Sequence, residues 1–429
     1  MKKSFVGLTK PVLEYQSLTG LMTKPEKIAI PKKASLFFKG AYSQKNAVLL
    51  KIGEKVKTGQ KLCLYKDSDE YAVSPVTGTV SLISSYLGNF GQSCAMVTID
   101  TADTEEFDES FRAVCADPSL DAAKDFLTGA AGSPCFGCFS DPEKKIKTIV
   151  VCGTDSDILV ETNGYIAASK SDIITKGVSI LKKITHASTV IVALPKALVK
   201  DAGAIGGASG AEIREIGSEY PSALPLVMIK NVLGQPVPAG KMPEDMGVCF
   251  FSAEAVASIG AAFTDGRIPV TKTLTLIRKD LSRVMVEARI GTPIADIFTA
   301  CGVTVSEKDR IIIGGPMTGV SVYTEEHPVT PDTDAIMVQG SDDVSLVSDY
   351  PCINCGECVR ICPMNVPVNM MVRFLEAGQY QEAADMYDLH CCIECGLCSF
   401  VCVSKMPIFQ YIRLAKYELS RIPAAAEEA

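Results

Sequence analysis

The C-terminal part of the chain repeats one cysteine pattern twice. The spacing C-x2-C-x2-C-x3-C occurs in residues 352–362 and again in residues 392–402. Each iron of a [4Fe-4S] cubane takes one thiolate, and in two-cluster proteins the fourth cysteine of each run ligates the other cluster, because the chain turns back on itself. The pattern therefore predicts two [4Fe-4S] clusters, the first held by Cys352, Cys355, Cys358 and Cys402 and the second by Cys362, Cys392, Cys395 and Cys398.

Zinc and disulfides are the competing uses of so many cysteines. Structural zinc takes separated C-x2-C pairs, and disulfide frameworks are typical of short secreted chains. This chain has 429 residues with 17 cysteines, and its first residues, MKKSFVGL, lack the apolar core of a signal peptide. We therefore expect a cytoplasmic protein that moves electrons one at a time.

Charge and hydropathy narrow the range of partners. The net charge of −8 leaves no basic stripe to neutralise phosphates, which argues against nucleic acid. No apolar run reaches the length of about 18 residues that a membrane span needs, and the nearest candidate, residues 246–263, is interrupted by Glu254. We expect partners that are proteins or small redox molecules.

The N-terminal domain, predicted over residues 1–115, alternates short β-type runs with glycine and proline. Residues 52–62 and 74–80 resemble the barrel-sandwich hybrid of biotinyl and lipoyl domains. Lys66 lies near the hairpin tip where those carriers are modified. A plain structural barrel is the favoured interpretation, with a swinging-arm site at Lys66 as the alternative.

An α/β domain is predicted over residues 116–268, because apolar runs alternate there with helical spacing. Strand, helix and strand joined by short connections indicate a parallel sheet. The expected strands cover residues 147–152, 187–194 and 224–229, and the expected helices cover residues 171–184 and 253–262.

Two smaller domains complete a multidomain α+β chain. A second α/β unit is predicted over residues 269–341, with a helix opened by Thr292 at the cap and Pro293 in the first turn. A helical, ferredoxin-like dicluster domain is predicted over residues 342–429. Its helices should cover residues 368–388 and 408–419, before a loose tail at 424–429.

In this order the domains resemble the C subunit of the Rnf electron transport complex over nearly the whole chain. Residues 311–319 read IIIGGPMTG and precede HPVT at 327–330, close to the family's I-x-G-G-P-M-x-G and P-V-T segments. Residues 389–416 are similar to its second cysteine run and Q-Y-I-R-L-A-K helix. Residues 290–297 are similar to its soluble-ligand-binding β-grasp (SLBB) unit.

The resemblance implies a peripheral electron-transfer subunit on the cytoplasmic face of a membrane. Such a protein relays electrons between a soluble donor or acceptor, NADH or a ferredoxin-type protein, and the membrane subunits of an ion-translocating oxidoreductase. The alternative is a soluble cobalamin-reductase-like iron-sulfur flavoprotein, which reuses the same domains. Whether the chain is itself an enzyme depends on whether it retains an NADH site.

The family's glycine-rich loop, G-G-x-G-F-P-T-x-x-K, is altered in this chain. The loop belongs to a flavin and NADH site like that of the complex I flavin subunit, where glycines let the backbone approach phosphate. Residues 129–138 instead read GAAGSPCFGC. At these altered positions the chain more closely resembles the A subunit of the sodium-translocating NADH:quinone oxidoreductase. A later family run, N-x-x-E-C-E-P-Y, is also altered and reads CGTDSDIL at residues 152–159. FMN stays a candidate cofactor, with contacts expected at Gly129, Gly132, Pro134 and Asp155.

The altered loop gains two thiols, Cys135 and Cys138. A C-x2-C pair is a redox dithiol, part of a metal site shared with a partner, or two reduced thiols in a loop. We expect Cys152 near this pair, at the carboxyl edge of the parallel sheet. Cys391 is interpreted as a spare thiol beside a ligand. The remaining cysteines are expected to be small core residues: Cys63, Cys94, Cys115, Cys249 and Cys301.

Overall fold

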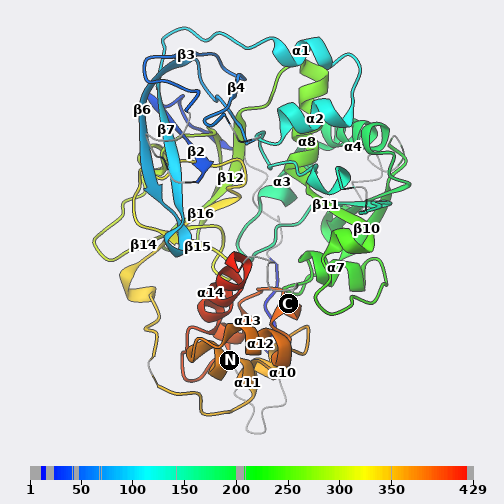
Figure 1. Cartoon of the computed structure of the whole chain (residues 1–429), viewed down its shortest axis with the longest axis vertical. Coiled ribbons are helices and arrows are strands. Elements are labelled where there is room, and N and C mark those ends of the chain that lie inside the picture. Colours follow the sequence, from blue (N-terminus) through cyan, green and yellow to red (C-terminus); the bar gives the residue numbers. More distant parts are fainter. Residues whose placement is uncertain are drawn as a thin grey trace.

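The computed structural model describes residues 11–15, 24–40, 42, 48–66, 68, 70–141, 143–199, 207, 209–348 and 350–422. A β-rich N-terminal unit and an α/β unit lie side by side, and a small helical domain lies at the opposite end of the molecule (Figure 1). The predicted tail at 424–429, the first residues MKKSFVGL, and Asp67 and Asp69 near the hairpin tip lie outside the described residues.

The N-terminal unit is an antiparallel sheet in the order β2-β7-β6-β3 with a separate β4-β5 hairpin pair. Apolar side chains alternate along β2 and β7, where Leu36 pairs with Val97 and both are buried. This alternation with a period of two places one face of each strand in the core. The strands are β2 (Lys33–Lys39), β3 (Lys55–Val56), β4 (Lys61–Leu62), β5 (Ala72–Val73), β6 (Gly78–Leu87) and β7 (Ser93–Thr101).

The second unit is a parallel sheet in the order β10-β9-β8-β11 with helices on both faces. Helices α4 and α8 pack closely, since a Cβ on Gly177 would lie 2.1 Å from the Val256 carbonyl oxygen. The strands are β8 (Thr148–Cys152), β9 (Thr189–Pro195), β10 (Glu212–Ile216) and β11 (Val248–Ser252). The helices include α2 (Leu120–Leu127), α3 (Thr162–Ser169), α4 (Ser171–Thr185), α7 (Pro225–Asn231) and α8 (Ala253–Asp265).

The strand predicted at residues 224–229 is wrong, because this segment forms helix α7. Pro225 lacks a backbone N–H and has a fixed φ, which suits the first turn of a helix and not an internal strand. The fourth strand is β10, an edge strand with the polar sequence EIREI. Because three of its five residues are charged, this strand has no apolar run that would predict it.

The third unit, for which the sequence predicts a β-grasp-like fold, has six strands in the order β1-β13-β12-β16-β14-β15 and one helix, α9 (Ile294–Cys301). Strand β1 comes from the N-terminal segment and pairs in parallel with β13. The predicted cap at Thr292 is wrong: Pro293 occupies the cap position, and the buried Thr292 hydroxyl has no hydrogen-bond partner among the described residues. The strands are β1 (Glu26–Lys27), β12 (Thr271–Ile277), β13 (Arg283–Arg289), β14 (Arg310–Ile313), β15 (Val320–Val322) and β16 (Ala335–Gln339).

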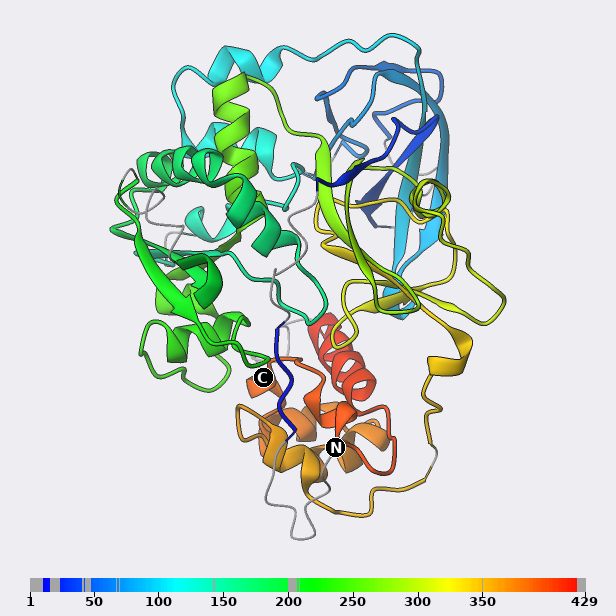
Figure 2. The same ribbon diagram turned by 180° about the vertical axis from the view of Figure 1, so that it is seen from behind.

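The C-terminal domain is helical, and its last helix, α14, points back toward the other units (Figure 1). The N-terminal segment 11–15 runs along the junction between this domain and the α/β unit (Figure 2), where Tyr15 N–H donates to the Ser218 carbonyl at 2.9 Å. No helix in the described part of the chain is long and apolar enough to cross a membrane. The helices are α10 (Glu357–Ile361), α11 (Val368–Glu376), α12 (Tyr380–Tyr387), α13 (Leu397–Phe400) and α14 (Ile408–Arg421).

Candidate functional site

The two cysteine runs share their spacing and their backbone conformation. Adding 40 to each cysteine position in the first run gives its counterpart in the second. Asn354 and Glu394 have φ of 57° and 54°, and Gly356 and Gly396 have φ of 75° and 74°. A short helix follows each glycine, and a longer helix begins at Val368 in one run and at its counterpart, 408, in the other. The domain is therefore an internal repeat in structure as well as in sequence.

The first three cysteines of run one meet the last cysteine of run two. They line one small cavity beneath α11, together with Met406 and Ile408. The cysteines in this cavity are Cys352, Cys355, Cys358 and Cys402. The structure thus brings together the four residues predicted as ligands of the first cluster.

The last cysteine of run one faces run two. Burial is the main cause of the raised pKa values of Cys392 and Cys395, and the negative charge of Cys362 raises both further, against the lowering effect of backbone N–H groups. Cys392 and Cys395 act in the same way on Cys398. The charge of Cys358 also raises the pKa of Cys398, so the two groups of thiols are neighbours.

Burial disfavours the charged thiolate in both groups of cysteines. Burial raises the pKa of the Cys358 thiol to about 11 and that of Cys395 to about 12. Coordination reverses this effect, because a metal ion stabilises the thiolate directly. Backbone N–H groups point at sulfur in both runs, from Asn354 to Cys352 and from Glu394 to Cys392, each at 3.4 Å. Among the described residues, no three His, Cys, Asp or Glu side chains are spaced to hold a single metal ion.

The second thiol group is held against the rest of the molecule by the G-G-P-M-x-G segment and by Tyr220. The Tyr220 hydroxyl donates to the Cys395 carbonyl at 2.7 Å, and Gly396 lies against the Met317 carbonyl. Apolar side chains of Leu224 and Leu397 belong to the same buried cluster. The segment singled out by sequence similarity therefore contacts the cysteine domain directly.

Asp157 positions this segment, a role that the sequence analysis missed. Its buried carboxylate accepts hydrogen bonds from the Thr318 N–H at 2.7 Å, the Thr318 hydroxyl at 2.8 Å and the Met317 N–H at 3.1 Å. A Cβ on Gly315 would lie 2.5 Å from the same carboxyl group. The available signal was the second acidic residue of the altered family run, two residues after Asp155.

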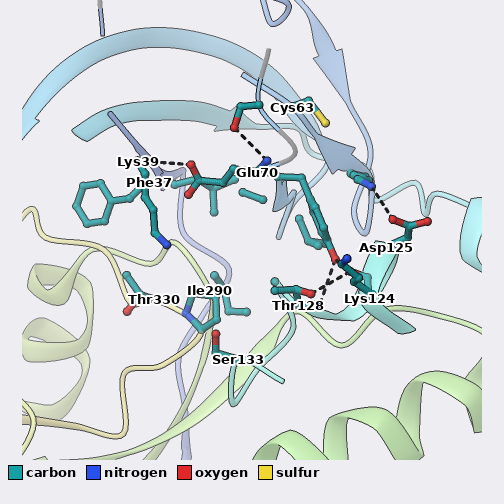
Figure 3. Close-up of a pocket in the computed structure, with 18 of the residues that line it drawn as sticks. Phe37, Lys39, Cys63, Glu70, Lys124, Asp125, Thr128, Ser133, Ile290 and Thr330 are labelled. Atoms are coloured by element: carbon teal, nitrogen blue, oxygen red, sulfur yellow. Dashed lines mark hydrogen bonds and ion pairs between the residues drawn. The ribbon is translucent and has the colours of Figure 1, made fainter. Parts of the chain in front are cut away.

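The altered glycine loop borders a cavity of about 760 Å³ between the N-terminal sheet, the loop and the six-stranded unit (Figure 3). Gly129 and Ser133 line this cavity. Gly132 does not: its φ is +81°, and a Cβ there would lie 2.3 Å from the Ala255 nitrogen. Pro134 is buried outside the cavity lining. Gly132 is therefore required for packing against α8.

The backbone N–H groups at the starts of α3 and α8 already donate hydrogen bonds to side chains of the chain itself. The Asp155 carboxylate accepts from the Asn163 N–H at 3.0 Å at the start of α3. At the start of α8, Ser252 accepts from the Ala255 N–H at 3.0 Å, and Asn163 accepts from the Glu254 N–H at 3.2 Å. A phosphate binds a helix N-terminus through free N–H groups, so the predicted contacts at Gly132, Pro134 and Asp155 do not fit an FMN phosphate in the family manner.

The prediction that Cys152 approaches the loop thiols is wrong. Cys152 ends β8 and packs with Val150 on the face covered by α7. Cys138 instead lies 3.2 Å from Cys249, whose side chain belongs to the core on the opposite face. Successive strand residues point to opposite faces, so the sheet separates Cys152 from this pair.

Among the other cysteines, Cys249 is buried as expected of a core residue. Cys391 is half-buried beside the ligands. The other four expected core residues, Cys63, Cys94, Cys115 and Cys301, are half-buried. Cys135 is exposed.

Comparison with known proteins first defines the class of the central unit. Residues 127–261 match the family described as the Nuo51 FMN-binding domain. A chain of NAD+-reducing [NiFe]-hydrogenase in the H2-reduced state has 13% identity and a TM-score of 0.46, covering 72% of this chain and 65% of that chain. The family match alone makes the α/β unit similar in sequence to the flavin subunit.

Comparison over the whole chain then gives the particular relatives. It is 25% identical to the C subunit of the Na(+)-translocating ferredoxin:NAD(+) oxidoreductase complex of Acetobacterium woodii, over 82% of each protein. It is 28% identical to the proton-translocating counterpart of Clostridium ljungdahlii, over 97% of this chain and 94% of that protein. The C subunit of the Pseudomonas aeruginosa ion-translocating oxidoreductase complex is 28% identical over 86% of this chain, which spans 50% of that longer protein. The resemblance to the C subunit of the Rnf complex is confirmed.

Proposed function

We propose that this chain is a peripheral electron-transfer subunit of an Rnf-like, ion-translocating oxidoreductase, and that it carries two [4Fe-4S] clusters. The observation that carries this proposal is the exchange of fourth cysteines: Cys402 lies with the thiols of the first run, and Cys362 lies near those of the second. The proposed ligands are Cys352, Cys355, Cys358 and Cys402 for the first cluster and Cys362, Cys392, Cys395 and Cys398 for the second.

The clusters supply one-electron chemistry, and the residues around them set its conditions. Burial of thiolates disfavours added negative charge, whereas N–H groups aimed at sulfur favour it. Both influences act here, through the buried Cys395 and through the N–H groups of Asn354 and Glu394. The proximity of Cys358 and Cys398 supports transfer from one cluster to the other.

The two thiol groups differ in exposure, which supports different partners. Cys355 is exposed, and Ile353 beside it has an exposed fraction of 66%. The second group is packed against Tyr220 and Met317. We propose that the first cluster exchanges electrons with another protein at this open end of the domain.

The proposed electron donor is inferred from the altered loop. Gly132 and Pro134 lie outside the cavity lining and Asp155 caps α3, so three of the four predicted FMN contacts are used internally. We therefore propose that electrons enter from a ferredoxin-type protein and not from NADH through a flavin. A location on the cytoplasmic face, against membrane subunits, is proposed from the relatives, whose names describe parts of multisubunit complexes. These relatives do not favour the soluble cobalamin-reductase alternative.

The test uses the anaerobically purified, cluster-loaded chain with FMN added. The proposal predicts that a reduced ferredoxin bleaches the visible iron-sulfur absorbance and that NADH does not, with dithionite as the positive control. Rapid bleaching by NADH would overturn the proposed donor. Failure of affinity-tagged chain to retain membrane subunits in mild detergent would overturn its place in a membrane complex.

A further inference from the structure

One thiol of the loop that replaces the glycine-rich segment, Cys138, lies beside a thiol of strand β11, Cys249, and both are far from the proposed cluster ligands in sequence. Cys138 lies in a short 3-10 turn, Gly137–Phe139, and its sulfur is 3.2 Å from the sulfur of Cys249 on β11. A disulfide bond is about 2.05 Å long, so the two sulfurs need to approach by only about 1 Å. We propose that Cys138 and Cys249 form a reversible dithiol–disulfide couple that fastens the loop to the edge strand β11.

The two thiols are unequal in a way that suits thiol–disulfide exchange. Cys138 is half-buried, and the hydrogen bond with Cys249 lowers its pKa. Cys249 is 2% exposed, and the hydrogen bond together with burial raises its pKa. The attacking group in exchange is the thiolate. Cys138 therefore attacks first, and Cys249 is the thiol that resolves.

The oxidant is a small disulfide such as oxidised glutathione. The Cys138 thiolate attacks one of its sulfurs, forms a mixed disulfide and releases one small thiolate. Cys249 loses its proton and attacks the Cys138 sulfur, which forms the protein disulfide and releases the second small thiolate. Two protein thiols lose two electrons and two protons, and the small disulfide gains both.

Formation of the bond would connect two parts of the flavin-type unit that are distant in sequence. Strand β11 is at the edge of the parallel sheet and pairs with β8. The loop side carries Phe136, which is buried and lies 5.7 Å from the Phe251 ring. It also carries Ser133, which lines the large cavity. The couple would thus fix the wall of that cavity to the sheet, independently of the cluster domain.

The test equilibrates the cluster-loaded chain anaerobically in glutathione buffers from fully reduced to fully oxidised. Remaining thiols are then alkylated, and the disulfides are identified by peptide mass spectrometry. The expected result is one intramolecular disulfide, Cys138–Cys249, that is restored to thiols by reduced glutathione, while the cluster absorbance stays constant. Cys138→Ser should abolish it without affecting the fold, because this side chain lies in a partly exposed turn. Cys301→Ser, at a half-buried thiol elsewhere, should leave it unchanged.

Three results would overturn the inference. A Cys135–Cys138 disulfide would show that the exposed neighbour is the true partner. Full alkylation of both Cys138 and Cys249 in the most oxidised buffer would show that the pair is inert. Stoichiometric zinc that is lost in both Cys138→Ser and Cys249→Ser would show that the pair binds metal.

Discussion

The Tyr220 hydroxyl donates a 2.7 Å hydrogen bond to the backbone carbonyl of Cys395, although 175 residues separate them in the chain. Tyr220 belongs to the α/β unit, and Cys395 is a proposed ligand of the second cluster. Both are buried in one apolar cluster. This contact explains how a cysteine domain at the far end of the molecule is held in a fixed position against the flavin-type unit.

Replacing Tyr220 by Phe should weaken this attachment. The variant leaves a buried carbonyl without its partner, which costs about 1–3 kcal/mol. Tyr220→Leu also removes the aromatic packing and should cost more. The measurement is the urea concentration at which cluster absorbance is lost under anaerobic conditions. An unchanged midpoint for Tyr220→Phe would mean that the hydrogen bond does not stabilise the domain.

The internal repeat offers a matched pair of glycine substitutions. Gly356 and Gly396 have the same left-handed backbone, with φ of 75° and 74°. A Cβ on Gly356 meets nothing within 4 Å, whereas a Cβ on Gly396 lies 2.5 Å from the Met317 carbonyl oxygen. Alanine at either site costs about 1 kcal/mol for its positive φ, and only Gly396→Ala also displaces the G-G-P-M-x-G segment. Limited proteolysis should cleave Gly396→Ala fastest; equal cleavage of the two variants would contradict the proposed contact.

Lys272 on β12 is a second link between units. Its fully buried ammonium group pairs with Glu254 on α8 and lies 2.9 Å from the Asp334 carboxylate. Lys272→Met leaves Glu254 buried without its cation, and loss of one partner from a buried pair costs about 3–5 kcal/mol. The exposed pair of Lys57 and Glu106 provides the control, since Lys57→Met should change stability little. Similar denaturation midpoints for the two variants would contradict this account.

The raised pKa of the buried Asp155 carboxyl group should make the stability of the protein fall as the pH rises toward neutrality. Burial, followed by the charge of Asp334, raises its pKa from 3.8 to about 7. Between these values the folded chain binds more protons than the unfolded chain. The stabilisation that protonated Asp155 gives to the folded state is therefore fully present below about pH 4 and is lost as the pH rises to about 7. Asp155→Asn cannot ionise and keeps one acceptor oxygen. From pH 5 to 8 the wild type should lose up to about 3 kcal/mol relative to the variant. Parallel profiles would show that Asp155 does not titrate in this range.

Local patterns in the sequence predicted the regular elements well. The helix expected at 171–184 is α4, and the helix expected at 253–262 lies within α8, because both have strong apolar spacing. The strand expected at 147–152 is β8 for the same reason. The segment at 224–229 was misread because its apolar run is compatible with a short buried helix as well as with a strand.

The site was predictable only where its residues recur at fixed spacing. The cysteine runs carry their own period, so the two groups of thiols could be assigned before the fold was known. The approach of Cys138 to Cys249 joins positions 111 residues apart and leaves no periodic trace. The role of Asp157 likewise depends on a loop 160 residues away. Such contacts follow from the packing of units and not from local sequence.

The most direct test of the central claim is the iron and acid-labile sulfide content of two double variants, measured on anaerobically reconstituted protein alongside its EPR spectrum after reduction. If the fourth cysteines are exchanged, Cys352→Ala with Cys402→Ala damages one cluster and leaves half of the iron, whereas Cys352→Ala with Cys362→Ala damages both. Cys391→Ala is the control and should retain both clusters. The reverse outcome, with half of the iron retained by the variant lacking Cys352 and Cys362, would contradict the exchanged arrangement.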